Sequence, residues 1–146
     1  PVNLAIPTLN INAAFQWVGK NNKGEMAIPS NFKDVAWYKL GTIPGEIGSA
    51  VIAGHVDNAL SLPGVFKNLS EINTGDDIYI KNEAGETLHF KVTDKEVFAY
   101  NDPDAASAVF GLSDKRLIKL VTCEGEWIKS QKTYDQRLVV TAELTP

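Results

Sequence analysis

Three residues whose types can cooperate in catalysis stand near the ends of predicted strands. Cys123, the one cysteine of the 146-residue chain, ends the apolar run RLIKLVTC, His55 follows VIAG, and Arg137 opens the run RLVV. A cysteine thiolate is a strong nucleophile, and an imidazole exchanges protons near neutral pH. A guanidinium keeps its charge while it binds an oxyanion. Together these side-chain types are suited to nucleophilic attack on a carbonyl group.

Each of these residues also has an ordinary structural explanation. A lone cysteine is most often a small buried apolar residue, a histidine after a strand is often part of a turn, and most arginines are exposed. The second histidine, His89, provides a contrast. In ETLHFKV it alternates with Leu88 and Phe90, so it is expected to face solvent. Taken singly, none of the three candidates is decisive.

The rest of the chain is predicted to form strands. Short segments rich in Val, Ile, Tyr, Phe and Trp recur between clusters of Gly, Pro, Asn and Asp, a pattern typical of β proteins. Two connections look helical, residues 63–72 and residues 101–111. In the second, Asp102 is the expected N-cap, Pro103 the first helical residue, and Gly111 the residue just past the end. Strands at this spacing, without long alternating helices, predict an all-β fold, either a closed barrel or a sandwich, with short connecting helices.

The composition limits the partners and the cofactors. The 14 basic and 18 acidic residues give a net charge of −4, and the basic residues are scattered, so a nucleic-acid partner is not expected. A single cysteine excludes an internal disulfide and any site with several cysteine ligands. Acidic pairs at Asp76–Asp77 and at Asp102 and Asp104 have no recognisable ligand spacing, so neither a metal nor another cofactor is expected.

No apolar run approaches the roughly 18 residues of a membrane span. Because the sequence begins at Pro1 without a methionine, we expect an anchor or targeting segment of the full-length protein to lie outside it.

Taken in order, the three candidate sites resemble those of the sortases, cell-surface cysteine transpeptidases of mainly Gram-positive bacteria. The resemblance rests on AGHV around His55, LVTC ending at Cys123, and QRLVV, whose Arg137 comes 14 residues after the cysteine (137 − 123). It extends over nearly the whole chain, through NLAIPTLNINAAFQWVG, GEIGSAVIAGHVD and VFKNLSEINTGDDIYI. The motifs GHVD and TCEGEW…YDQRLVV look more like class F than class A, whose segment between the cysteine and the arginine tends to carry a longer, helix-bearing loop.

The resemblance implies an eight-stranded β-barrel that forms a single catalytic domain over residues 1–146. Cys123, His55 and Arg137 take the catalytic positions, and Thr122 is expected to bind the substrate peptide. The implied substrate is an LPXTG-type sorting signal of surface proteins, cleaved between Thr and Gly through a thioester. The acyl group would then pass to an amine of a peptidoglycan precursor or of another surface protein. The implied location is the extracellular face of the cell membrane, with the anchor in the part of the protein outside this sequence.

Other interpretations are open. An L,D-transpeptidase-like domain shares the cysteine nucleophile, but its histidine normally comes shortly before the cysteine, whereas His55 and Cys123 are 68 residues apart (123 − 55). A non-catalytic cell-surface β binding module would make all three residues incidental, and substitution of Cys123 would then change local packing only. Thr122 has its own alternative, that of a strand-forming residue that points inward.

Overall fold

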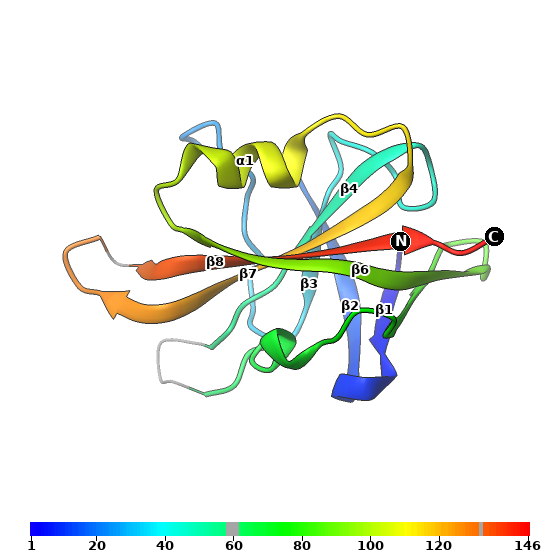
Figure 1. Ribbon diagram of the computed structural model, residues 1–146, viewed down its shortest axis with the longest axis horizontal. Helices are drawn as coiled ribbons and strands as arrows, with labels where there is room; N and C mark the ends of the chain where they lie inside the picture. The colour runs from blue at the N-terminus through cyan, green and yellow to red at the C-terminus, as the bar shows by residue number, and fades with distance from the viewer. Residues whose placement is uncertain (58–61, 132) are drawn as a thin grey trace.

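The computed structural model describes residues 1–57, 62–131 and 133–146, and for residues 123–126 it describes the backbone but not the side chains. Eight strands of the described chain close into a barrel in the order β1-β2-β3-β4-β7-β8-β6-β5 (Figure 1). The strands are β1 (Asn3–Ile6), β2 (Ile11–Val18), β3 (Val35–Tyr38), β4 (Gly48–Ala53), β5 (Asp77–Lys81), β6 (Thr87–Ala99), β7 (Arg116–Ile128) and β8 (Thr133–Leu144). The predicted all-β class is confirmed, and the closed barrel replaces the sandwich alternative.

Alternate residues of each strand point into a single apolar core. Along β8, Leu138, Val140 and Ala142 are buried inside the barrel, as the alternation of the sequence predicts. The first predicted helix is shorter than expected, because residues 63–72 contain only one 3-10 turn, η2 (Leu69–Glu71). The rest of that segment is used to fill the core, and its three almost fully buried side chains are spaced three apart: Phe66, Leu69 and Ile72.

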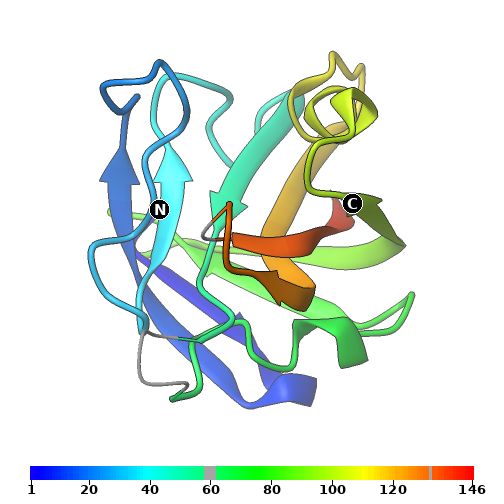
Figure 2. The same ribbon diagram turned by 90° about the vertical axis from the view of Figure 1, so that its left-hand side faces the viewer.

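The second predicted helix is confirmed as α1 (Pro103–Phe110), which lies against the outer surface of the barrel (Figures 1 and 2). The Asp102 carboxylate caps it by accepting a hydrogen bond of 2.9 Å from the Asp104 amide, and the Gly111 amide bonds back to the Ser107 carbonyl. Val109 of α1 packs in a second, outer apolar cluster with Val51 of β4 and Val139 of β8. None of the helices that the structure describes is long and apolar enough to cross a membrane. A further 3-10 turn, η1 (Pro7–Leu9), joins β1 to β2.

Three neighbouring strands position the candidate residues. β4 and β7 run parallel, with register pairs from Gly48↔Arg116 to Ala53↔Val121. β7 and β8 run antiparallel and form the longest hairpin of the barrel, with one register shift between Glu124 and Trp127. The end of β4 at Ala53 is therefore level with Val121 of β7, which continues beyond it to Ile128, and β8 passes that level in the opposite direction.

Candidate active site

The strand register brings the three candidate positions to one place on the barrel. Cys123 of β7 is paired directly with Arg137 of β8, and Cα atoms of such antiparallel partners lie about 4.5–5.5 Å apart. His55 is two residues beyond Ala53, the last paired residue of β4, and Cys123 is two residues beyond its partner Val121. The backbone thus brings all three positions together, while the thiol of Cys123 lies outside the described side chains.

The imidazole of His55 is oriented by a main-chain carbonyl. Its Nε2 lies 3.0 Å from the carbonyl oxygen of Pro29, a buried residue of the β2–β3 connection. Since a carbonyl oxygen can only accept a hydrogen bond, Nε2 carries the hydrogen in this contact. Nδ1 is therefore the ring nitrogen that can gain or lose a proton. The pairing of Pro29 with His55 spans 26 residues, and no pattern in the sequence predicted it.

Thr122 fixes the backbone next to His55. Its hydroxyl donates a hydrogen bond of 2.8 Å to the carbonyl oxygen of Gly54, and the Gly54 amide donates to the Val121 carbonyl at 3.2 Å. Only 5% of Thr122 is exposed, so its side chain points inward, as the alternative interpretation held. The predicted contact between Thr122 and a peptide stays a prediction.

Glycine is required at two positions around His55 because other atoms approach their α-carbons closely. A Cβ on Gly54 would lie 2.6 Å from the ring of Phe66 and 2.8 Å from Val65, while a Cβ on Gly64 would lie 2.8 Å from the carbonyl carbon of His55. The Phe66 amide also donates to the His55 carbonyl at 2.9 Å. Residues 64–66, later in the same β4–β5 connection, thus pack directly against the backbone that carries the histidine.

The guanidinium of Arg137 is held by the beginning of its own strand. Nη1 donates to the carbonyl oxygens of Tyr134 and Gln136 at 2.9 and 3.0 Å, and Nη2 donates to the Thr133 hydroxyl at 2.8 Å. The ring of Tyr100 lies 6.0 Å from the guanidinium carbon, within range of a cation–π contact. The side chain is only partly buried, and the backbone that carries this fixed cation is paired with that of Cys123.

Arg137 also lines a mainly apolar cavity of about 330 Å³ between α1 and the outer face of β4, β7 and β8. Small aliphatic side chains make most of its wall, and Glu25 is its acidic residue. The lining residues are Glu25, Met26, Val51, Ala53, Ala105, Ala106, Val109, Phe110, Val121, Arg137 and Val139. A cavity of this kind is suited to a ligand with apolar groups, and the candidate cation is part of its wall.

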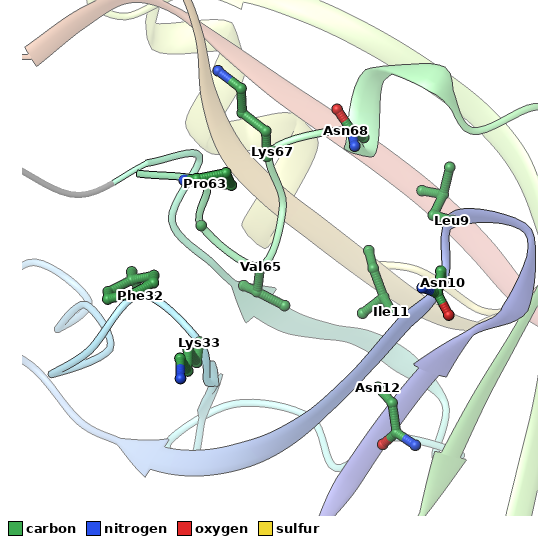
Figure 3. Close-up of a pocket in the computed structure, with 11 residues that line it drawn as sticks. Leu9, Asn10, Ile11, Asn12, Phe32, Lys33, Pro63, Val65, Lys67 and Asn68 are labelled. Carbon is green, nitrogen blue, oxygen red and sulfur yellow. The ribbon is translucent and has the colours of Figure 1, made fainter. Parts of the chain in front are cut away.

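A second cavity, of about 400 Å³, lies between the start of β2 and the connections that precede β3 and follow β4 (Figure 3). Lys33 and Lys67 contribute its positive charges, and Figure 3 shows their side chains pointing in opposite directions. The two ammonium groups therefore do not converge on one anion. None of the three candidate catalytic residues lines this cavity.

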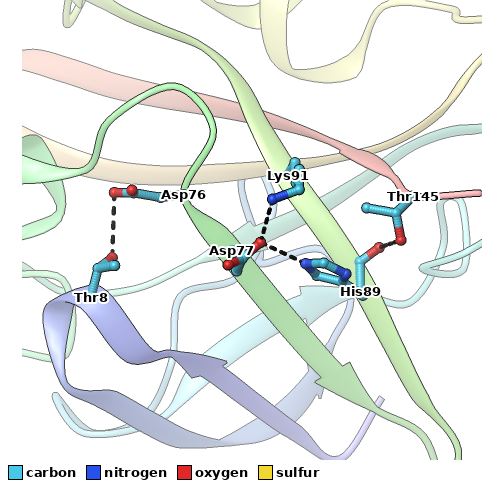
Figure 4. Close-up of polar contacts among 6 residues, drawn as sticks. All are labelled: Thr8, Asp76, Asp77, His89, Lys91 and Thr145. Atoms are coloured by element: carbon cyan, nitrogen blue, oxygen red, sulfur yellow. Dashed lines mark hydrogen bonds and ion pairs between the residues drawn. The ribbon is translucent and has the colours of Figure 1, made fainter.

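The other histidine belongs to a side-chain cluster on β5 and β6 (Figure 4). His89 Nε2 lies 2.7 Å from Asp77 Oδ1, which also accepts a hydrogen bond from Lys91 Nζ at 2.9 Å. The Tyr79 ring stacks on the imidazole at 4.7 Å. The His89 side chain is 33% exposed, so it lies on the outer face as predicted, although it has a partner there. The bond from Lys91 and the one from His89 hold the pKa of the Asp77 carboxyl below its usual value.

The comparisons with known proteins agree on one family. The Sortase domain model matches residues 4–145, and no curated protein gives a match. The chain is similar in structure to the lid mutant of sortase A from Corynebacterium diphtheriae, with a TM-score of 0.74 and 24% identity over 100% of this chain and 71% of that one. It is also similar to sortase C-1 from Actinomyces oris (TM-score 0.72, 21% identity, 99% and 71% covered). Sortase D5 from Clostridium perfringens matches at a TM-score of 0.72 and 19% identity, over 99% of this chain and 78% of that one.

Proposed function

The chain belongs to the sortase family, whose members are cysteine transpeptidases, and on that premise we propose that Cys123, His55 and Arg137 are its catalytic residues. The observation that carries the proposal is the strand register, in which Cys123 is opposite Arg137 and level with the segment that carries His55. Within the proposal, residues 1–146 are a single catalytic domain. A non-catalytic binding module and an L,D-transpeptidase-like enzyme do not fit the family match.

The first half of the proposed reaction forms an acyl-enzyme. The Cys123 thiolate attacks the threonine carbonyl carbon of an LPXTG-type sorting signal, and a C–S bond forms as the carbonyl π electrons move to oxygen. When the tetrahedral intermediate collapses, the C–N bond to glycine breaks and the leaving amine takes a proton from His55. Because Nε2–H of His55 is held by Pro29, the proton that is transferred is the one on Nδ1. The product is a thioester between threonine and Cys123.

Arg137 stabilises the negative charge that develops on the threonine oxygen. The guanidinium is already fixed by carbonyl oxygens of its own strand, so little reorganisation is needed when the oxyanion forms. A main-chain amide just after Cys123 is the second proposed donor, since oxyanion holes commonly use backbone N–H groups. Lysine would keep the charge at position 137 but could not make the planar, forked contacts.

The apolar cavity beside Arg137 is the proposed binding site for the residues that precede the scissile bond. Its Val and Ala walls suit the leucine and proline of the sorting signal, and because Arg137 is one of its lining residues, a peptide bound there would present the following threonine to the nucleophile. Thr122 is almost fully buried below this surface and donates its hydroxyl to Gly54. A contact between Thr122 and the peptide would therefore require its oxygen to accept a further hydrogen bond.

In the second half of the reaction, an amine attacks the thioester and displaces the thiolate of Cys123. Neutral His55 accepts the proton that the amine loses, which returns the enzyme to its starting state. The proposed acceptors are amines of peptidoglycan precursors or of other surface proteins. The GHVD and YDQRLVV motifs support assignment to class F, and the proposed location is the extracellular face of the membrane, with an anchor outside this sequence.

Mass spectrometry of the protein and its substrate tests this function. The protein and a Cys123→Ala variant are incubated with an LPXTG-containing peptide, with and without a glycine-based amine. We expect cleavage after threonine, a thioester adduct on the cysteine form only, and a transfer product when the amine is present. The absence of both cleavage and adduct across a panel of sorting signals and pH values would refute the proposal.

A further inference from the structure

A hydrogen bond between two side chains joins the segment that carries His55 to the hairpin that carries Arg137. The hydroxyl of Tyr134, at the start of β8, donates to Oδ2 of Asp57, and both residues are partly buried. The two residues are 77 positions apart in the chain. Neither belongs to the proposed set of three catalytic residues.

On the histidine side, the link to the imidazole is short. Asp57 is two residues after His55, and its backbone forms a bridge with Pro63 across the β4–β5 connection. The Gly64 amide donates to the Val56 carbonyl at 3.0 Å, so the backbone between the imidazole and the carboxylate is held from behind. Asp57 is therefore joined to His55 by two peptide units of a backbone that is itself hydrogen-bonded.

On the arginine side, Tyr134 itself holds the guanidinium. Its carbonyl oxygen accepts the 2.9 Å hydrogen bond from Arg137 Nη1. The β7–β8 ladder is interrupted between Glu124 and Trp127, and Tyr134 pairs with Trp127 beyond the interruption. Their rings meet edge to face, with centroids 5.3 Å apart. The backbone that orients Arg137 thus lies where the ladder is irregular. A side-chain hydrogen bond is most useful for fixing the backbone at such a place.

We propose that the Tyr134–Asp57 hydrogen bond makes these two residues positioning residues, which hold His55 and Arg137 at a fixed separation on either side of Cys123. This inference rests on the proposed catalytic function. The bond acts on His55, the proposed general acid, through Asp57. It acts on Arg137, the proposed oxyanion donor, through the Tyr134 carbonyl. It contributes to the orientation of the transition state and makes no contact with the peptide, so it affects kcat rather than KM.

The kinetic test compares single substitutions with the transfer assay. We expect Tyr134→Phe, which removes only the hydroxyl, to lower kcat about 10-fold and to change KM by less than about twofold. Asp57→Ala should give the same loss. Asp57→Asn keeps an oxygen that accepts the hydrogen bond, so it should restore kcat to within about twofold of the unsubstituted enzyme. Tyr79→Phe is the matched control, because Tyr79 is a partly buried strand tyrosine on β5, which β8 and β6 separate from β7.

The double variant shows whether the two substitutions act through one shared hydrogen bond or independently of each other. Tyr134→Phe with Asp57→Ala should lose about 10-fold in kcat, as each single variant does, instead of about 100-fold, because both substitutions break the same bond. A multiplicative loss overturns the proposal. So does a Tyr134→Phe variant with unchanged kcat, or one in which only KM rises, since the hydroxyl would then contact the peptide.

A second measurement does not depend on activity. Nitrogen-15 NMR of the Arg137 guanidinium, assigned by the signals missing from an Arg137→Lys sample, reports how fast its protons exchange with solvent. We expect faster exchange in Tyr134→Phe than in the unsubstituted protein or in Tyr79→Phe, because the carbonyl that holds Nη1 is loosened. An unchanged exchange rate would overturn the proposal that the Tyr134–Asp57 hydrogen bond helps to hold the guanidinium. If the unsubstituted protein does not process sorting signals, the transfer assay refutes the proposed function. The exchange rates still test whether the Tyr134–Asp57 hydrogen bond holds the guanidinium.

Discussion

Replacing Thr122 by valine tests how the barrel supports the backbone beside the histidine. Valine has almost the shape of threonine and favours strands equally well, so the substitution removes a hydroxyl from a buried site without making a cavity. The lost contact is the 2.8 Å hydrogen bond to the Gly54 carbonyl, which joins β7 to the end of β4. Thr122 is 5% exposed, so water cannot readily replace the missing donor.

The expected loss of stability follows from this burial. Leaving the partly buried Gly54 carbonyl without its partner costs about 1–2 kcal/mol of unfolding free energy. For a domain of this size, each kcal/mol corresponds to about 3 °C in Tm, and we therefore expect Thr122→Val to lower Tm by about 3–6 °C. Thr122→Ser keeps the hydroxyl and should recover most of the bond, although it loses a buried methyl group that is worth about 1 kcal/mol.

Calorimetry and steady-state kinetics on the same samples provide the assay. Thr87→Val is the control, because Thr87 is an exposed strand threonine at the start of β6, and its Tm should change by less than about 2 °C. If Tm is unchanged in Thr122→Val while KM for the peptide rises, our account of Thr122 as a backbone support is wrong. That result would favour the contact with the sorting peptide that the family resemblance predicts.

Three further substitutions test other parts of the structure. Gly64→Ala should lower both Tm and activity, because its Cβ would lie 2.8 Å from the carbonyl carbon of His55; normal melting and turnover would show that the backbone yields easily. Arg137→Lys should slow formation of the acyl-enzyme by about 10²–10³-fold in rapid-quench experiments, and a loss of less than about threefold would exclude the guanidinium as the main oxyanion donor. The pKa of the Asp77 carboxyl is lowered chiefly by the hydrogen bond from Lys91, so its contribution to stability is present above its ordinary pKa of 3.8 and is lost as the pH falls further. Asp77→Asn should therefore be slightly less stable at pH 7 and indistinguishable in acid, as urea unfolding at both pH values can show; an equal difference at both would contradict the ion-pair explanation.

The sequence predicts those features of this protein that depend on local patterns. The alternation in RLVVTAEL correctly places Leu138, Val140 and Ala142 inside the barrel. The Asp102-Pro103 pair correctly marks the start of α1. These predictions succeed because strand periodicity and helix capping are determined by neighbouring residues.

The helix expected over residues 63–72 is largely absent for the opposite reason. Phe66, Leu69 and Ile72 have a spacing that also suits a helix, but the barrel core takes all three side chains, and tertiary packing overrides the local preference. The partners of the catalytic candidates were missed as well. The contact of His55 with Pro29 joins positions 26 apart, and that of Tyr134 with Asp57 joins positions 77 apart. Such pairs follow from the order of strands in the barrel, which no local pattern contains.

The site therefore has two levels of support that respond differently to substitution. The regular ladders of β4, β7 and β8 set where the Cys123 and Arg137 backbones lie, and they share the stability of the whole core, typically 5–15 kcal/mol for a domain of about this size. The imidazole is oriented by a hydrogen bond to Pro29 and the guanidinium by three hydrogen bonds at the start of β8, each worth about 1 kcal/mol. A substitution at Tyr134 or Asp57 is thus expected to loosen the proposed catalytic groups while the barrel stays folded, whereas loss of the buried hydroxyl of Thr122 is expected to destabilise the barrel itself. For this reason kinetic constants are the sensitive measurement at the first two positions and Tm at the third.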